Sequence, residues 1–346
     1  MEIKKKLIGL TLEQLRGVAA ETGLPQFSAR QMARWLYEKR VCSVDEMTDL
    51  SKAGRERLAA SYCVGRTAPK LCSRSTDGTA KYLFDGRGGR DIEAVMIPDS
   101  GRATLCVSSQ AGCRMNCSFC MTGRQGFHGN LDAADIINQV LSIEESADLT
   151  NIVFMGMGEP MDNIDAVLSA IDILTAPWGL AWSPKRITVS SVGVLKNLRR
   201  LLDETKVHVA ISVHSPFAQE RASMMPAEKA YPVAGVMELL RHYDFAHQRR
   251  LSVEYTMFRG VNDSLRHADA LARLIKGTSA RVNLIRYHAI DSDDSRRPSS
   301  TATMETFRDR LNTLGVTATV RASRGEDIDA ACGMLAGKNS TETNQP

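Results

Sequence analysis

Three closely spaced cysteines carry the clearest chemical signature in this sequence. Cys113, Cys117 and Cys120 stand in the run CRMNCSFC, with the spacing Cys-x-x-x-Cys-x-x-Cys. Thiolates bind iron–sulfur clusters and zinc, and a complete tetrahedral site needs four protein ligands, whereas this run supplies three. The pattern favours a four-iron, four-sulfur (4Fe-4S) cluster with one iron left open for a substrate. A zinc site completed by Cys106 or by a distant histidine is the alternative.

The other five cysteines are scattered along the chain. We interpret Cys42, Cys63 and Cys72 as small buried side chains without a chemical role. Cys106 precedes the cysteine run, and Cys332 is isolated near the C-terminus. The N-terminus lacks the apolar core of a signal peptide and the chain has no long apolar run. We therefore expect a cytoplasmic protein without membrane contact, whose thiols are reduced or bind metal.

The elements that must position the cysteine run form a regular pattern. From about residue 130 strand-like runs such as 151–156 and 208–214 alternate with helices, and together with the earlier run 103–109 they make about six strands. A parallel sheet with right-handed crossovers requires this alternation. The predicted fold class is α/β, with a whole or partial (β/α) barrel. Its reactive groups are expected on the loops after the carboxyl ends of the strands.

A different pattern precedes the barrel. Apolar residues at three- and four-residue steps predict helices at 11–23, 28–40 and 51–62. Strand-like runs follow at 81–86 and 91–98, separated by the glycine-rich turn DGRGGR. We expect a small helical accessory domain at 1–64, a β extension or linker at 65–98, the barrel at 99–338 and a disordered tail at 339–346.

The charge of the chain is concentrated near its N-terminus. Residues 1–90 hold 17 Lys and Arg but 10 Asp and Glu, while the whole chain has a net charge of +4. Lys and Arg bind phosphates and release their counterions, so a basic segment suggests a polyanion as partner. A solvated helical surface explains the same charge equally well.

Several longer motifs resemble a known family. SSQAGCRMNCSFCMTG, VFMGMGEPMDN, ISVHSP and GEDIDAACG occur in the order found in radical S-adenosylmethionine (SAM) enzymes that methylate carbon C2 of an adenine at the peptidyl-transferase centre of 23S ribosomal RNA (rRNA). The resemblance spans essentially the whole chain. It implies a radical SAM barrel, a 4Fe-4S cluster held by Cys113, Cys117 and Cys120, and two SAM molecules per methyl transferred.

The resemblance also implies partners. These are 23S rRNA, often a transfer RNA (tRNA) with an adenine just after the anticodon, and an electron donor such as flavodoxin. Basic residues of the N-terminal helices would contact RNA phosphates, namely Arg30, Arg34, Lys39 and Arg40. A sister group methylates C8 of the same ribosomal adenine and confers antibiotic resistance, and C8 methylation is the second candidate.

Roles for three catalytic residues follow from the same resemblance. Adenine C2 is an electron-poor carbon that cannot attack the SAM methyl group, whereas a carbon radical can add to it. Cys332 matches the thiol that first carries the methyl group, since sulfur is a strong nucleophile. Glu93 matches the acceptor of the ring proton. Cys106 matches the thiol that releases the product by attacking the Cys332 sulfur.

The expected SAM-binding residues all lie at strand ends. They are Gly158, Glu159, Ser190, Ser212, Val213, His214 and His288. A glycine permits close backbone approach to a ligand, and the Glu159 carboxylate can pair with the amino group of SAM. His288 departs from the family pattern, because many relatives have asparagine there.

A function of another class competes with this one. A non-catalytic RNA-binding module with a structural zinc ion or cluster explains the basic N-terminus and the three clustered cysteines. It leaves Cys332 and the glycine–glutamate loop unexplained.

Overall fold

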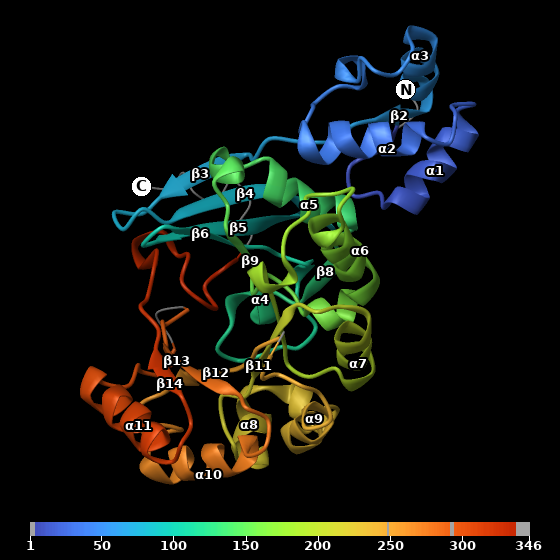
Figure 1. Ribbon diagram of the computed structural model, residues 1–346. Helices are drawn as coiled ribbons and strands as arrows, with labels where there is room; N and C mark the ends of the chain where they lie inside the picture. Colours follow the sequence, from blue (N-terminus) through green and yellow to red (C-terminus); the bar gives the residue numbers. More distant parts are fainter. Residues whose placement is uncertain (1–3, 248, 291–293, 337–346) are drawn as a thin grey trace, which may run out of the picture.

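One ten-stranded sheet organises the computed structural model, which describes residues 4–247, 249–290 and 294–336 (Figure 1). The strand order is β14-β13-β12-β11-β10-β9-β6-β5-β4-β3. The strands are β3 (Leu71–Arg74), β4 (Ala80–Arg87), β5 (Arg90–Asp99), β6 (Arg102–Cys106), β9 (Asn151–Phe154), β10 (Ile187–Ser191), β11 (His208–Ser212), β12 (Leu251–Met257), β13 (Arg281–Arg286) and β14 (Ala318–Val320).

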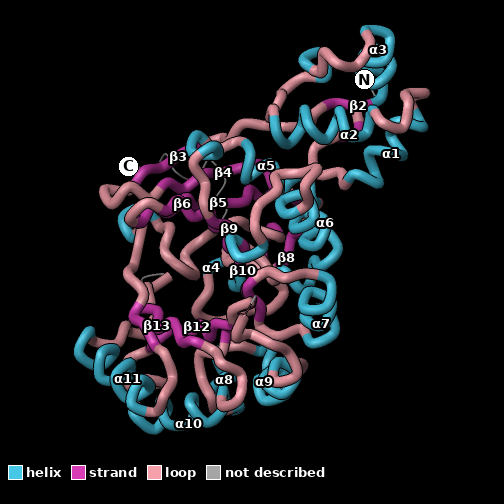
Figure 2. The backbone as a smooth tube through the Cα atoms, in the orientation of Figure 1, coloured by secondary structure: helices cyan, strands magenta, loops and turns pink. Residues whose placement is uncertain are grey.

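The part of this strand order that runs from β6 through β9 to β14 is parallel and forms the barrel part of the sheet. Helices connect them and cover the outer face of the sheet (Figure 2). The larger ones are α5 (Ala133–Leu141), α6 (Ile164–Thr175), α7 (Leu195–Glu204), α9 (Val233–Leu240), α10 (Leu265–Ile275) and α11 (Thr301–Thr313). Since β14 and β3 end the strand order without pairing to each other, the sheet stays open. The predicted α/β class with a partial (β/α) barrel is confirmed, with seven parallel strands among the described residues in place of about six.

The β extension continues the same sheet with antiparallel strands. Gly88 and Gly89 both adopt positive φ and form the turn between β4 and β5 that the glycine-rich run predicts. In the register of this region Glu93 lies opposite Leu83, and Val95 lies opposite both Lys81 and Cys106. Alternate residues of a strand share a face, so Lys81, Glu93 and Cys106 lie on one face of the sheet.

A helical unit precedes the sheet and lies beside α5 and α6 (Figure 1). It contains α1 (Leu12–Glu21), α2 (Ser28–Ala33) and α3 (Lys52–Ser61), with the short strands β1 (Lys5–Lys6) and β2 (Tyr62–Cys63) paired in parallel. The helix predicted at 28–40 is divided, because α2 passes into a π-helical turn at Arg34–Glu38.

The interpretation of Cys42, Cys63 and Cys72 as buried side chains is wrong. Cys42 is exposed. Cys63 and Cys72 are half-buried, because they lie on the short strands β2 and β3, where neighbouring segments leave them partly accessible.

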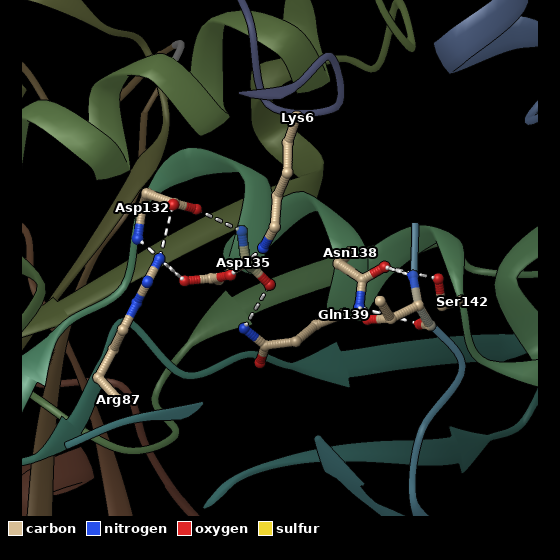
Figure 3. Close-up of polar contacts among 8 residues, drawn as sticks. Lys6, Arg87, Asp132, Asp135, Asn138, Gln139 and Ser142 are labelled. Atoms are coloured by element: carbon tan, nitrogen blue, oxygen red, sulfur yellow. Dashed lines mark hydrogen bonds and ion pairs between the residues drawn. The ribbon is translucent and has the colours of Figure 1, made fainter. Parts of the chain in front are cut away.

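Helix α5 connects the three parts of the chain (Figure 3). Asp132 caps its first turn by accepting from the Asp135 backbone N–H. Lys6 from the helical unit and Arg87 from β4 both pair with Asp135. On the next turns, Asn138 exchanges hydrogen bonds with the backbone of Thr67. The helical unit and the β extension are therefore anchored on the same barrel helix.

No helix in the described segments is long and apolar enough to cross a membrane. The tail at 339–346, predicted to be disordered, lies outside the described residues.

Candidate active site

The three clustered cysteines lie between β7 (Gln110–Gly112) and the end of the single-turn helix α4 (Met121–Arg124), and we call residues 113–124, which include this helix, the cysteine loop. Backbone bonds shape this loop: the Cys113 N–H donates to the Gly126 carbonyl at 2.9 Å, and the Cys120 N–H donates to the Cys117 carbonyl at 3.1 Å. Gly112 adopts φ +70, and a Cβ at this position would lie 1.8 Å from the Gly126 carbonyl oxygen. Only glycine fits there, so the glycine before the first cysteine sets the approach of the loop to β8 (Phe127–Asn130).

The chemistry of these thiols fits a cluster. Burial raises the pKa of Cys113 to about 12, and the negative charges of Glu159 and Cys120 add to this effect. Burial also raises the pKa values of Cys117 and Cys120. Three thiolates so placed need a cationic group, and iron supplies it because coordination deprotonates a thiol. Among the described residues, no three His, Cys, Asp or Glu side chains lie close enough together to hold a single metal ion.

The loop after β9 brings Glu159 beside the cysteine loop. Its backbone N–H donates to the Gln110 side chain at 2.9 Å, just before the cysteine run. Gly158 has φ +98, and a Cβ there would lie 2.5 Å from the Gln110 Cβ atom. The backbone of the loop that carries Glu159 therefore packs directly against the Gln110 side chain. The Glu159 carboxylate accepts from the N–H groups of Met161 and Val192 at 3.1 and 2.9 Å. Burial raises its pKa to about 7.

The ends of β10 and β11 lie next to Glu159 and share a buried arginine. Arg221, on the short helix α8 (Ala218–Met224), is fully buried. Its guanidinium donates to the carbonyls of Val192, Ser212 and Val213 at 3.0, 2.9 and 3.1 Å and pairs with Glu228. One planar group with five donors thus fixes the loops after two neighbouring strands.

His214 is held in one protonation state at the end of this loop. Burial, together with the charge of Arg221, lowers its pKa to about 3, so it is neutral at physiological pH. Its Nδ1 accepts from the Thr256 N–H at 2.9 Å, which places the ring proton on Nε2. Its ring contacts Phe119 of the cysteine loop edge to face, with centroids 4.9 Å apart. His214 can therefore offer an N–H donor beside that loop.

The remaining expected SAM contacts are less closely grouped. Ser190 and Ser212 are half-buried and Val213 is buried, all at the ends of β10 and β11. His288 follows β13, and its ring contacts Ser323 at 3.0 Å, with burial lowering its pKa. The structure thus brings together Glu159, the strand ends and the cysteine loop, and it gives His288 partners from the C-terminal segment.

The C-terminal segment returns across the sheet and carries Cys332 (Figure 1). We call residues 325–336 the carrier loop. The Gly333 carbonyl accepts from the Met121 N–H at 2.8 Å, and the Leu335 carbonyl accepts from the Thr122 hydroxyl at 2.7 Å. These bonds place the carrier loop directly against the cysteine loop. Cys332 is exposed as a residue, while burial of its thiol group raises the pKa of Cys332.

Glu93 and Cys106, the other two expected catalytic residues, lie on the face of the sheet that the carrier loop crosses. The Glu93 carboxylate accepts from the Ala336 N–H at 2.9 Å and is itself buried. Burial raises the pKa of Cys106 to about 12, with a smaller contribution from the charge of Cys332. Cys106 lies on the same face of the sheet as Glu93. The fold thus brings Glu93, Cys106 and Cys332 to one side of the barrel mouth.

Several residues of the site were missed by the sequence analysis. Gln110 and Ser191 contact Glu159, Arg221 fixes the strand ends, and Lys81 contacts Glu93. Ser191 directly follows the expected Ser190, which lies on the opposite face of β10. A polar residue at a strand end was the available signal for Ser191, whereas α8 is too short for a clear helical pattern around Arg221.

Comparisons with known proteins identify the class to which this fold belongs. Residues 107–272 match the radical SAM superfamily, and residues 5–64 match the ribosomal RNA large subunit methyltransferase N-terminal domain. The crystal structure of a radical SAM methyltransferase from Sphaerobacter thermophilus superimposes with a TM-score of 0.90 and 37% identity, covering 96% of this chain and 99% of that one. Fold and site together therefore define a radical SAM enzyme.

Curated relatives narrow the class. A "Probable dual-specificity RNA methyltransferase RlmN" from Parabacteroides distasonis is 56% identical over 98% of both chains. The "Dual-specificity RNA methyltransferase RlmN" from Syntrophobacter fumaroxidans is 40% identical over 94% of this chain and 96% of its own. The chain belongs to the RlmN family. It is an RNA methyltransferase that uses a 4Fe-4S cluster and SAM, and the alternative of a non-catalytic zinc module is ruled out.

Proposed function

We propose that this enzyme methylates carbon C2 of an adenine in 23S rRNA and, as the relatives' dual-specificity names suggest, in some tRNAs. One observation carries the proposal. The carrier loop with Cys332 contacts the cysteine loop through Met121 and Thr122, and it contacts Glu93 through Ala336. A methyl group on Cys332 would therefore lie between the SAM site and a carboxylate, as C2 methylation by a methyl carrier needs.

Cys113, Cys117 and Cys120 would hold the cluster, and Gly158, Glu159, Ser190, Ser212, Val213, His214 and His288 would bind SAM. When bound and reduced, the cluster supplies the electron that cleaves SAM into methionine and a 5′-deoxyadenosyl radical. The buried Glu159 carboxylate pairs with the SAM amino group, which favours its ionised form. The Nε2–H of neutral His214 donates a hydrogen bond to the ligand.

Cys332 carries the methyl group in two stages. Its thiolate first attacks the methyl carbon of one SAM, so that a sulfur–carbon bond forms and S-adenosylhomocysteine leaves. A second SAM later provides the radical that takes a hydrogen atom from this methyl group. The methylene radical on the Cys332 sulfur then adds to adenine C2. Two SAM molecules are consumed for each methyl group transferred.

Glu93 and Cys106 complete the reaction. The adduct radical would return one electron to the cluster, which gave up an electron when the second SAM was cleaved, and Glu93 would accept the ring proton. The Cys106 thiolate next attacks the Cys332 sulfur, which forms a disulfide and breaks the sulfur–methylene bond. The electron pair stays on the base-bound carbon, which takes a proton and becomes the product methyl group. The raised pKa of Cys106 means that its thiol must lose a proton at this stage.

Nucleoside analysis tests the proposal. We would incubate the anaerobically reconstituted enzyme with SAM, a reductant and unmodified 23S rRNA or tRNA, then digest the RNA and analyse it by mass spectrometry. We expect 2-methyladenosine from both RNAs, and an accumulated protein–RNA adduct with Cys106→Ala. 8-Methyladenosine would instead support the second candidate, C8 methylation. Release of methylated RNA by Cys106→Ala at the normal rate would refute the role of Cys106.

A further inference from the structure

Lys81 occupies a position between Glu93 and the carrier loop. Its Nζ lies 3.5 Å from Glu93 Oε1 and donates to the Asp329 carbonyl at 3.3 Å. The Lys81 side chain is 16% exposed and that of Glu93 is 6% exposed. An ion pair shielded from water to this extent is screened less than a surface pair.

The sheet register explains why these side chains meet. Lys81 and Glu93 are diagonal neighbours on β4 and β5, because Lys81 pairs with Val95 and Glu93 pairs with Leu83. Diagonal cross-strand neighbours on one face are within reach of long side chains. Lys81 therefore points to the same face as Glu93, where the carrier loop crosses the sheet.

The pair holds the carrier loop at two points. Lys81 binds the Asp329 carbonyl, and the other oxygen of Glu93 accepts from the Ala336 N–H at 2.9 Å. Cys332 lies between these two points in the sequence. The Asp329 backbone is in the left-handed region with φ +52, a conformation that costs energy for a non-glycine residue and persists where its surroundings hold it.

We propose that Lys81 is a positioning residue that clamps the carrier loop and orients the Glu93 carboxylate toward the reacting base. This inference deepens the proposed function and rests on it for the role of Glu93. Lys81 makes both contacts with one ammonium group, so the proton acceptor and the methyl carrier share a single anchor. Removing that anchor disturbs the placement of both groups.

The test compares Lys81→Met with Lys81→Arg and with a matched control, Lys70→Met. Lys70 lies just before β3 and pairs with Asp85 and Asp91, so its removal breaks a comparable ion pair away from the carrier loop. Hydrogen exchange of peptides covering 325–336 reports on the clamp without any substrate. We expect exchange at least about tenfold faster in Lys81→Met, corresponding to loss of about 1.4 kcal/mol of local stability. Lys81→Arg and Lys70→Met should retain wild-type exchange in this loop.

Kinetics report on the Glu93 part of the inference. We expect kcat of Lys81→Met to fall by about ten- to a hundredfold, with KM for RNA and SAM unchanged, because misplacing a reacting group costs rate and not binding. Lys81→Arg should recover most of kcat. Wild-type exchange and kcat in Lys81→Met would overturn the inference, and so would equal losses in Lys70→Met. Faster exchange with unchanged kcat would overturn the role in orienting Glu93.

The two levels of the proposal fail separately. If the wild-type enzyme forms no methylated adenosine from either RNA, the proposed function fails, while the exchange comparison still decides whether Lys81 clamps the loop. A general loss of structure in Lys81→Met would appear as a lower urea midpoint and lower iron content. In that case Lys81→Arg decides: loss of the exchange protection in this folded, charge-retaining variant overturns the clamp, and retention supports it.

Discussion

The two sides of the barrel mouth are built differently. On the proposed SAM side, Glu159 follows β9 and His214 follows β11, the two parallel strands that flank β10, and both side chains are buried. Glu159 accepts from the Val192 N–H and His214 accepts from the Thr256 N–H, so each is fixed by the backbone of another segment. Arg221 donates hydrogen bonds to carbonyls at the ends of both β10 and β11 and so fixes the two loops relative to each other. These contacts belong to the core of the barrel, so we expect this side to keep its shape for as long as the domain is folded.

The carrier side depends on a loop. Cys332 is exposed, and its loop is tied down by side chains of the β extension and α4: Asp77 binds Gly325, Lys81 binds Asp329, Glu93 binds Ala336 and Thr122 binds Leu335. In the proposed mechanism Cys332 meets SAM first and adenine later. A loop held by a few separable bonds can make such a movement, whereas the strand ends of the SAM side cannot. This difference matches the proposed roles, with SAM binding at the strand ends and methyl transport by the carrier loop.

The largest predicted effect is on the carrier side. Cys332→Ala removes the methyl carrier, so methyl transfer should disappear completely while the iron content and SAM binding stay at wild-type values. Cys42→Ala is the matched control, because Cys42 is also exposed but lies in the helical unit. Iron analysis, SAM binding and nucleoside mass spectrometry measure the three quantities. Methylated product from Cys332→Ala would show that methyl transfer does not need Cys332, and the carrier side would then have no role distinct from that of the SAM side.

The next effect is on stability and belongs to the SAM side. Arg221→Met leaves Glu228 buried without its partner, and breaking a buried pair in this way costs about 3–5 kcal/mol. Arg200→Met removes a partly exposed arginine from Asp165 and Glu204 and should cost much less, because solvent screens these pairs. Urea unfolding of the two variants makes the comparison. Equal losses would show that the strand ends are no more integral to the core than the surface.

A pH-dependent effect on the SAM side is smaller. Burial raises the pKa of Glu159 to about 7, the nearby Asp162 charge contributes in the same direction, and the SAM ammonium favours the ionised carboxylate. SAM affinity should therefore weaken as the pH falls through 7, by about tenfold between pH 7.5 and 6. Equilibrium dialysis with the reconstituted enzyme measures this change. In Glu159→Gln binding should be weaker and independent of pH over this range; a pH dependence that persists there would contradict the role of Glu159.

The sequence could predict the SAM side better than the carrier side, for a physical reason. The alternation of strands and helices predicts a parallel sheet, and parallel strands bring their carboxyl ends to one edge, which places Glu159 and His214 at the same edge without further information. Ser191 and Arg221 escaped because they depend on the twist at one strand end and on a seven-residue helix. The carrier loop depends on contacts across much of the chain, such as Asp77 with Gly325, which no local pattern encodes.

The smallest predicted effect is local: it concerns the hydrogen exchange of the carrier loop and leaves the free energy of unfolding of the whole protein unchanged. The Asp77 carboxylate accepts from the N–H groups of Thr79 and Gly325 at 2.9 and 3.0 Å. Burial by itself raises the pKa of Asp77, but these hydrogen bonds outweigh it and lower the pKa below the usual 3.8, so the anchor stays ionised unless the pH falls well below that value. Asp77→Asn keeps the shape of the side chain but replaces one carboxylate oxygen with an NH₂ group. This group is a donor, so it cannot accept from the N–H group that it faces.

We expect Asp77→Asn to speed hydrogen exchange of the peptide that begins at Gly325 by about fivefold, which is less than the effect of Lys81→Met because the clamp at Asp329 and Ala336 remains. The urea midpoint should not change, in contrast to Arg221→Met. Asp85→Asn is the control, since Asp85 is an exposed carboxylate of the same extension that pairs with Lys70. A fall in global stability equal to that of Arg221→Met would place the carrier loop in the core of the fold and end the distinction between a fixed side and a mobile one.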